Sequence, residues 1–535
     1  MAGRRTVPDS SVRWRRVLIY THRWLGITCS LLFVGWFVSG IVMMYAGMPV
    51  LSTEERLTRL ATLDLSLARV DVGSAAARLG VSPERILIGM LGNRPVYRFT
   101  GAEGWTTVYA DTGDVLDALD AGETLSIVRR FAPEHAGTVR YDARLTEPDQ
   151  WTLQSRAFLP LHRVVIGDAA ETVLYVSDRT GEPVMQTTRD SRRWAYLGAV
   201  AHWLYFTPLR SRAALWTDVV IWLSMLGCVL CLSGLVWGLW RVGFRKRYRL
   251  RAGPSYSPYA GLMRWHHYAG LVFGLVTCTW VFSGLLSMDP WIWHPGTEPT
   301  RIQRQVVTGG PLRLGLLTVE QLRAGVRAIV PSFVPKELEV VQLLGEPHLL
   351  AVNARDPVVD DVRVSLPNTL TGEWTHPLEQ RLVSVEHLMR GAFSRFEAKR
   401  FAALPVAVMP GADIIDATWL RTDDAYYYDR SRLRRLPVFR VKYNDPVRTW
   451  LYFDPFRGTI ARKEERLTRL NRWLYHGLHS LDFPFLYSRR PFWDIVVILL
   501  SLGGIAISVT PIAQAWRRLR GHARRRSRVF GVFLT

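Results

Sequence analysis

Four histidines lie at matching places in two pairs of similar segments. The stretch HRWLGITCSLLFVGWFVSG begins at His22, and the stretch HHYAGLVFGLVTCTWVFSG begins at His266. The same interval separates each of these histidines from the last glycine of its stretch. His202 and His479 each precede a tryptophan by another equal interval, and an aspartate closely follows each tryptophan. The chain therefore reads as two similar halves, and internal duplication is common in membrane proteins.

Histidines placed in this way indicate metal chemistry. Ionisable side chains at membrane depth are costly and are functional candidates by default, and neutral imidazole is a good iron ligand. Two imidazoles on facing helices can hold the iron of a b-type haem from both sides. His22 and His266 would hold one haem, and His202 and His479 a second, stacked across the bilayer. The alternative is a set of interfacial histidines, because a duplication also copies structural residues.

The chain has no CxxCH motif, which excludes covalent attachment of a c-type haem. Neighbouring histidines leave the exact ligands open. His267 adjoins His266 and points about 100° away from it on a helix, so only one of them can face a given iron. The repeat favours His266, and His267 could ligate instead or hydrogen-bond a propionate. His476 and His479 are spaced i, i+3 and share a helical face, so they cannot hold one iron from opposite sides.

Four further residues are candidates for contacts with the cofactor or the substrate. Arg23 and Arg264 flank the histidines at the start of their spans and could pair with haem propionates. His162 and His387 stand in the segments between spans, with apolar neighbours. An ordinary surface or core position explains both, and an extra ligand or a substrate contact is the alternative.

Apolar runs must position these histidines. Hydrophobic residues make up 48% of the 535 residues, and there are 21 tryptophans. A helix that crosses a bilayer takes about 20 apolar residues. Four runs reach this length, at 17–44, 215–240, 267–288 and 492–515. We therefore expect an α-helical membrane protein with four transmembrane helices. The first run is expected to be a retained anchor rather than a cleaved signal peptide.

The net charge of +22 follows the same topology. Arginines crowd the N-terminus, the segment after the second run and the segment after the fourth, and basic clusters beside spans mark the cytoplasmic side. The termini (1–16 and 516–535) and the loop 241–266 are then cytoplasmic, while 45–214 and 289–491 face outward. Because topology accounts for the charge, no nucleic-acid partner is expected.

The two outer segments mix short helices with strands. VYRFTGAEGWTTVYADTGDV and WLYFDPFRGTIARKEE predict hairpins with glycine turns, and SLPNTLTGEW (365–374) is a looser version. We expect one small α+β domain in each segment, with a membrane-surface helix at the end of the first. Residues 301–318 are expected to be a linker. All four cysteines lie inside the apolar runs, so no disulfide is expected in the outer segments.

The span motifs resemble one known family. THRWLG with its following span, RWHHYAGLVFG with the later WVFSGLLSMDPW, and NRWLYHGLHSLDFPFLY with the later WDIVVILLSLGG are similar to the PepSY-associated transmembrane proteins. That family includes bacterial inner-membrane ferric-siderophore reductases. The similarity covers roughly residues 15–515. The strands at Asp111–Gly113 and Asp178–Gly181 resemble PepSY modules, and FDPFRGT departs from their pattern at Arg457.

The resemblance implies two haem b groups in the transmembrane helices. By position it places the ligands at His22, at His202, at His266 or His267, and at His479 or His476. It also implies a bacterial inner membrane, periplasmic outer domains and reduction of a ferric siderophore to release Fe(II). The expected activity is therefore that of a ferric-siderophore reductase, an oxidoreductase that needs no catalytic acid or base.

The chain has no GxGxxG after a strand and no Walker loop, so a separate donor, either a quinol or a cytoplasmic reductase, must supply the electrons. Two other functions fit parts of the sequence. A non-redox membrane protein could use PepSY modules to bind peptides or to modulate a periplasmic protease. A siderophore transporter would need a pathway between broken helices, for which four spans leave little room.

Overall fold

The computed structural model describes residues 10–101, 104–244, 247–251, 253–331, 333–354, 378–428 and 435–532. The hairpin expected at 365–374 lies outside these residues. The chain divides into two compact units. The helical unit comprises Met1–Ala46, Ala195–His294 and Leu470–Thr535, and the sheet unit comprises Gly47–Trp194 and Pro295–Arg469.

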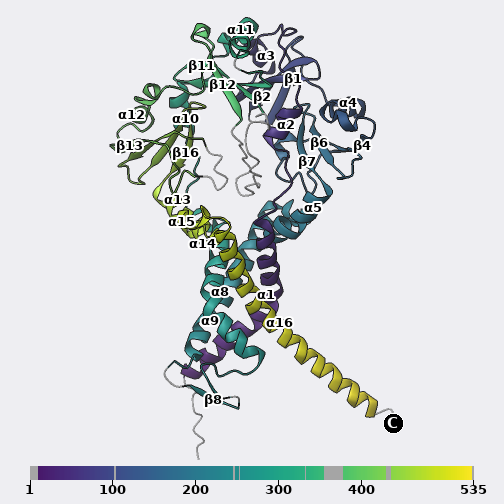
Figure 1. The fold of residues 1–535 in the computed structure, drawn as a ribbon, viewed down its shortest axis with the longest axis vertical. Coiled ribbons are helices and arrows are strands. Elements are labelled where there is room, and N and C mark those ends of the chain that lie inside the picture. Colours follow the sequence, from purple (N-terminus) through teal and green to yellow (C-terminus); the bar gives the residue numbers. More distant parts are fainter. Residues whose placement is uncertain are drawn as a thin grey trace, which may run out of the picture. The chain divides into compact units, whose positions relative to one another are not determined.

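Four long helices build the helical unit, and Figure 1 shows them packed together in one bundle. They are α1 (Ser10–Met43), α8 (Ala213–Arg241), α9 (Leu262–Leu286) and α16 (Phe492–Val532). Helices α1 and α9 each pack against both α8 and α16. All four are long and apolar enough to cross a bilayer, which confirms the four expected spans. A short hairpin, β8 (Tyr248–Leu250) and β9 (Gly253–Ser255), lies between α8 and α9.

A bent run of short helices precedes both α8 and α16. Before α8 the run is α5 (Arg189–Ala195), the π-helical turn η3 (Tyr196–Val200), α6 (Ala201–Trp203) and α7 (Thr207–Arg210). Before α16 it is α13 (Arg466–Asn471), the π-helical turn η8 (Arg472–Gly477), α14 (Leu478–Ser480) and α15 (Pro484–Tyr487). A left-handed leucine follows α6 and α14, Leu204 at φ 54° and Leu481 at φ 48°. Single π-turns are rare and concentrate at functional sites, and each of these ends two residues before a candidate histidine, His202 or His479.

The sheet unit is built around one antiparallel sheet of six strands in the order β12-β11-β10-β1-β2-β3. These are β1 (Arg85–Leu91), β2 (Arg94–Gly101), β3 (Gly104–Tyr109), β10 (Glu337–Leu343), β11 (Glu346–Asn353) and β12 (Glu379–Ser384). Buried residues of α3 (Val72–Leu79) and α11 (Val319–Ile329) form one core with this sheet. The two outer segments contribute three strands each and meet where β1 pairs with β10, with Ile88 opposite Leu338. The two domains expected from the sequence are therefore one unit in the structure.

Two smaller antiparallel sheets complete the sheet unit. One contains β4 (Arg140–Leu145), β5 (Leu161–Val165), β6 (Val173–Ser177) and β7 (Pro183–Thr187), with α4 (Ala121–Phe131) packed on it. The other contains β13 (Ile414–Leu420), β14 (Val438–Tyr443), β15 (Trp450–Asp454) and β16 (Thr459–Glu464). Both hairpins predicted from glycine turns are present, as β2–β3 and β15–β16. The remaining short elements are α2 (Thr53–Arg59), η1 (Pro133–His135), η2 (Arg156–Phe158), η4 (Pro290–Ile292), η5 (Leu314–Leu316), η6 (Leu388–Arg390), η7 (Ala398–Phe401) and α12 (Leu404–Val408).

The linker expected at 301–318 is wrong in its first half, which forms α10 (Arg301–Thr308). Thr300 accepts a hydrogen bond from the Gln303 amide, and the Gln303 side chain accepts one from the Thr300 amide. This reciprocal cap starts a helix efficiently. Gly309 ends the helix in the left-handed conformation.

Candidate functional site

One pair of histidines faces each other between α1 and α9. The ring centres of His22 and His266 are 6.2 Å apart, and the ring planes are inclined at 48°. Nδ1 of His22 lies 3.2 Å from the Leu230 carbonyl oxygen on α8. Nδ1 of His266 lies 3.2 Å from the Ile507 carbonyl oxygen and 2.7 Å from Thr510 Oγ1 on α16. Two helices therefore supply the rings, and the other two orient them.

A second pair faces each other at the opposite end of the bundle. The ring centres of His202 on α6 and His479 on α14 are 6.1 Å apart, with planes inclined at 72°. A backbone carbonyl oxygen and a serine hydroxyl lie within hydrogen-bond distance of each Nδ1. They belong to Trp36 (3.1 Å) and Ser39 (3.1 Å) for His202, and to Trp280 (3.2 Å) and Ser283 (3.1 Å) for His479.

The hydrogen bonds decide which ring nitrogen can bind a metal. A carbonyl oxygen can only accept, so Nδ1 of each ring carries the proton and the lone pair lies on Nε2. Metal-binding histidines usually donate their second nitrogen to a carbonyl or carboxylate in this way. Two imidazoles bonded to one metal from opposite sides, at about 2 Å per bond, place their ring centres about 6 Å apart. Both pairs have the donor atoms and the spacing that suit a haem iron with two axial histidines.

Glycines lie where these rings approach a neighbouring helix most closely. A Cβ atom on Gly234 of α8 would lie 2.6 Å from Cε1 of His22. Cβ atoms on Gly40 and Gly284 would lie 3.4 Å from Cε1 of His202 and 3.6 Å from Cε1 of His479. Only Gly234 leaves no room for a side chain without movement of the ring.

Most contacts of one half have a counterpart in the other. Trp36 and Ser39 hold His202 as Trp280 and Ser283 hold His479. Two indole N–H groups fix the position of the chain directly after the histidines: Trp216 donates to the Trp203 carbonyl at 2.8 Å, and Trp493 donates to the Ser480 carbonyl at 3.0 Å. In the two stretches that begin at His22 and His266, Trp36 corresponds to Trp280 and Ser39 to Ser283. Their matched spacing from the histidines was the available signal.

His267 stands apart from the pair that its neighbour forms. Its ring is buried, Nδ1 lies 2.8 Å from Ser257 Oγ and Nε2 lies 2.9 Å from the Gly238 carbonyl oxygen. Both nitrogens therefore join the loop after α8 to the end of α8. The structure brings His266, and not His267, opposite His22.

His479, and not His476, faces His202. The ring of His476 lies against Tyr475, with ring centres 4.6 Å apart. His476 is part of the π-helical turn η8, one turn before the residue that faces the partner ring.

The two candidate arginines lie near the first pair without contacting it. Arg23 is exposed, and its guanidinium carbon is 6.0 Å from the Trp24 ring centre. Arg264 is half-buried in the first turn of α9. In the part of the chain that the structure describes, neither side chain has a hydrogen bond to His22 or His266. A contact with propionates stays a prediction.

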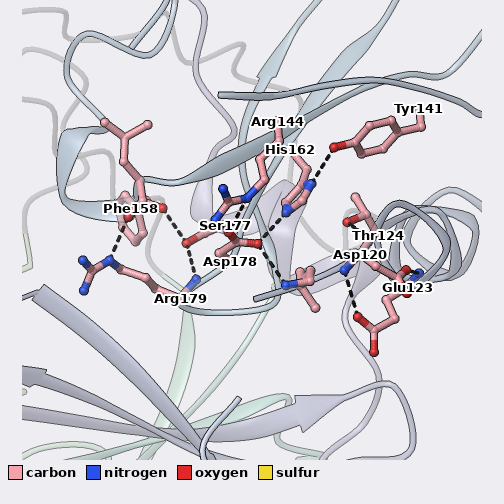
Figure 2. A network of polar contacts seen from close by, with 12 residues as sticks. Asp120, Glu123, Thr124, Tyr141, Arg144, Phe158, His162, Ser177, Asp178 and Arg179 are labelled. Carbon is pink, nitrogen blue, oxygen red and sulfur yellow. Dashed lines mark hydrogen bonds and ion pairs between the residues drawn. The ribbon is translucent and has the colours of Figure 1, made fainter. Parts of the chain in front are cut away.

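His162 and His387 both belong to the sheet unit. His162 is buried, Nε2 is bonded to Oδ1 of Asp178 and Nδ1 lies 3.0 Å from the Tyr141 hydroxyl (Figure 2). Both nitrogens are thus committed to a polar network within the domain. His387 is exposed directly before η6. These are the core and surface positions considered for them from the sequence.

Asp178 is the centre of the network in Figure 2. Oδ1 also accepts from the Leu119 amide, and Oδ2 accepts from Arg144 at 2.7 Å and 3.0 Å. Burial alone would raise the pKa of this carboxyl, but the hydrogen bonds from His162 and Arg144 outweigh it and lower the pKa below its ordinary value. The network therefore stabilises the fold only while Asp178 is ionised.

Replacing Asp178 by asparagine should lower the stability of the protein by about 1–3 kcal/mol at neutral pH, because buried partners lose a charged acceptor. A carboxyl whose pKa is lowered in the folded state contributes above its unfolded pKa and loses the contribution as pH falls through the folded value. The difference from wild type should therefore be constant down to about pH 5 and shrink below about pH 4. Thermal unfolding of the purified chain at several pH values measures it. Asp190→Asn, at an exposed carboxylate, is the control and should change little. Equal effects of the two variants would contradict this role of the network.

The comparisons with known proteins add no relative. Models of known protein families give no match to the chain, and curated proteins give none. Within the described residues there is no cluster of three or more histidine, cysteine or acidic side chains that could hold a metal ion. The two pairs of facing imidazoles are therefore the strongest candidate sites.

Proposed function

We propose that the chain is an electron-transfer protein of the bacterial inner membrane that carries two b-type haems and reduces a ferric siderophore in the periplasm. The single observation that carries this proposal is the pair of ring separations, 6.2 Å and 6.1 Å, with each Nδ1 directed at a backbone carbonyl. A haem held by two imidazoles supplies one-electron exchange at its iron. Nothing in that task needs a catalytic acid or base.

The chain's own residues would perform three tasks at each site. The histidines would hold the haem iron through Nε2, and the carbonyl oxygens that accept from Nδ1 fix the orientation of each ring and raise its basicity. The serines and Thr510 provide a second acceptor at three of the four rings. Buried apolar residues around α1, α8 and α9 keep water away from the middle of the bundle. Rigid rings in a dry environment keep the rearrangement small when charge moves.

Two sites at opposite ends of four spanning helices suit movement of an electron across the membrane. Under the positive-inside rule, the pair formed by His22 and His266 lies toward the cytoplasm, and the pair formed by His202 and His479 lies toward the periplasm. A quinol or a cytoplasmic reductase would then deliver electrons at the first pair. The matching contacts in both halves support descent from a duplicated unit.

The ferric siderophore is proposed as acceptor from the resemblance to PepSY-associated transmembrane proteins. Hard oxygen ligands hold Fe(III) tightly and Fe(II) weakly. Addition of one electron to the chelated iron therefore releases the metal without breaking a bond of the siderophore.

A reduced-minus-oxidised visible spectrum of the detergent-purified chain tests the cofactor. We expect the sharp alpha band of low-spin b-type haem and a content of two haems per chain. His202→Ala should remove one of them, because the cofactor loses one of two axial ligands. Asn471→Ala, a nearby change outside both pairs, should leave the content unchanged.

A flat difference spectrum after expression with ample haem would overturn the proposal. The non-redox reading, with a sheet unit that binds peptides, would then take its place. If haem is present, a second step mixes the reduced protein with ferric siderophore and follows the formation of Fe(II) with a chromogenic chelator. Oxidation of the haems without formation of Fe(II) would reject the acceptor and retain the electron carrier.

A further inference from the structure

Aromatic rings pack in the middle of the bundle, in the part of the interval between the histidine pairs that is nearer His202 and His479. On α1, Phe33 and Phe37 follow His22 on the face that also carries Gly26 and Cys29, at spacings of three or four residues. Phe33 is 4% exposed and Phe37 is 7% exposed. Along α1, the 1.5 Å rise per residue puts the levels of His22 and Ser39 about 25 Å apart. The side chains in this interval determine how strongly the two sites are coupled electronically.

The rings form a continuous series, here called the aromatic column and defined as Phe33, Phe37 and Trp280. The ring centres of Phe33 and Phe37 are 6.5 Å apart, and those of Phe37 and Trp280 are 5.8 Å apart. Both values lie in the range of direct contact between aromatic rings. The column thus crosses from α1 to α9.

Each end of the column reaches a residue that orients a histidine. Phe33 belongs to the same buried cluster as Leu230, whose carbonyl oxygen faces Nδ1 of His22. Trp280 itself provides the carbonyl oxygen that faces Nδ1 of His479. The column therefore reaches His479 through Trp280 itself and approaches His22 through the buried cluster that contains Leu230.

Glycines on the other two helices seat these rings. A Cβ on Gly227 of α8 would lie 3.2 Å from Cζ of Phe33 and 2.8 Å from Val281. A Cβ on Gly504 of α16 would lie inside contact distance of the Phe37 ring. At these two glycines the rings therefore pack directly on helix backbone.

Hydrogen bonding does not explain the tryptophan in the column. The indole N–H of Trp280 is buried and has no hydrogen-bond partner among the described residues. The indoles of Trp216, Trp237 and Trp493 do donate to an oxygen. A buried donor without a partner is destabilising, whereas leucine would fill an apolar core without that cost. The aromatic ring of Trp280, and not a hydrogen bond of its indole, is therefore the feature that matters at this position.

We propose that the aromatic column couples the two haem sites and carries the electron between them, an inference that rests on the proposed function. One electron leaves the site of His22 and His266, and one arrives at the site of His202 and His479. The rings are neither oxidised nor reduced, and no proton moves, because their π orbitals only shorten the gap through which the electron tunnels. Tunnelling is faster through close-packed atoms than through space.

Three variants of the full-length, haem-loaded chain test the column. Trp280→Leu removes the ring and keeps the carbonyl that orients His479. Trp280→Phe keeps an aromatic ring. Phe282→Leu is the matched control, since Phe282 lies on the same helix and is 40% exposed. Haem content and the midpoint potential of each site are measured first. Rapid mixing with one electron equivalent then follows the redistribution of the electron between the sites.

We expect a several-fold slower redistribution in Trp280→Leu, a rate close to wild type in Trp280→Phe, and no change in Phe282→Leu. Haem content and potentials should be equal in all four proteins. An unchanged rate in Trp280→Leu, with both haems bound, would overturn the column and leave the proposed function intact. A wild-type chain without haem would instead overturn the proposed function. A slower rate accompanied by a changed potential would show that Trp280 acts on a cofactor and would also reject the column.

Discussion

Replacement of His266 by alanine is expected to remove one haem from the protein, whereas the same change at His267 should leave both in place. His266 faces His22 with ring centres 6.2 Å apart, so under the proposed function its loss would leave the haem of this pair with one histidine instead of two. His267 forms hydrogen bonds with Ser257 and Gly238 through its two ring nitrogens. Its replacement would therefore free the loop after α8 but would not remove an iron ligand. Pyridine-haem assays and reduced-minus-oxidised spectra of both variants measure the difference.

The two variants form a matched comparison, because the residues are neighbours on one helix and undergo the same chemical change. A haem retained at the second pair serves as an internal test of folding in both proteins. Equal loss of haem in the two variants would show that the loop, rather than the ligand, controls the site. Loss in His267→Ala alone would contradict the pairing of His22 with His266.

The histidine pairs could be predicted from the sequence because they depend on helical periodicity. His22 and His266 precede spans that share glycine, tryptophan and serine at equal intervals, and a span has a fixed rise per residue. Residues that match along two such helices must lie at the same level of the bundle. The four spanning helices could be predicted for a similar reason, since length and composition alone define them.

The repeat favours His266 over His267, but the role of His267 could not be predicted in this way. It depends on Ser257, a residue in the loop after α8, and on the Gly238 carbonyl. Loop conformation and backbone acceptors leave no periodic trace in a sequence. The same holds for Leu230 and Ile507, which act through carbonyl oxygens that every residue type possesses.

The sequence also could not predict that the two outer segments contribute strands to one shared sheet. It depends on the pairing of β1 with β10, in which Leu87 lies opposite Glu339 across a long separation in the chain. Alternating patterns predict the strands of a hairpin, because the partners are close in sequence. They do not indicate which strand of a distant segment pairs with β1 in the middle of the sheet. His162 is a parallel case, since its partner Asp178 is close in space only after β5 and β6 pair.

Gly234 gives the second prediction of large effect. A Cβ atom there would lie 2.6 Å from Cε1 of His22, closer than real Cβ atoms approach. Gly234→Leu must therefore push the imidazole away from the Leu230 carbonyl and from His266. Crowding a packed core costs about 1–3 kcal/mol, and loss of ligand orientation typically lowers metal affinity about 10–100-fold.

We expect Gly234→Leu to lose the haem of the His22 pair and to keep the haem of the His202 pair. Gly35→Leu is the control, because a Cβ on Gly35 meets no atom within 4 Å. Haem content and the alpha band of both variants, compared with His22→Ala, measure the effect. If Gly234→Leu binds two low-spin haems, the ring of His22 is not held against α8 as the structure shows, and another residue must supply that ligand. If Gly234→Leu binds one haem, Gly234 is required for cofactor binding because it leaves room for the His22 imidazole, although glycine itself binds no iron.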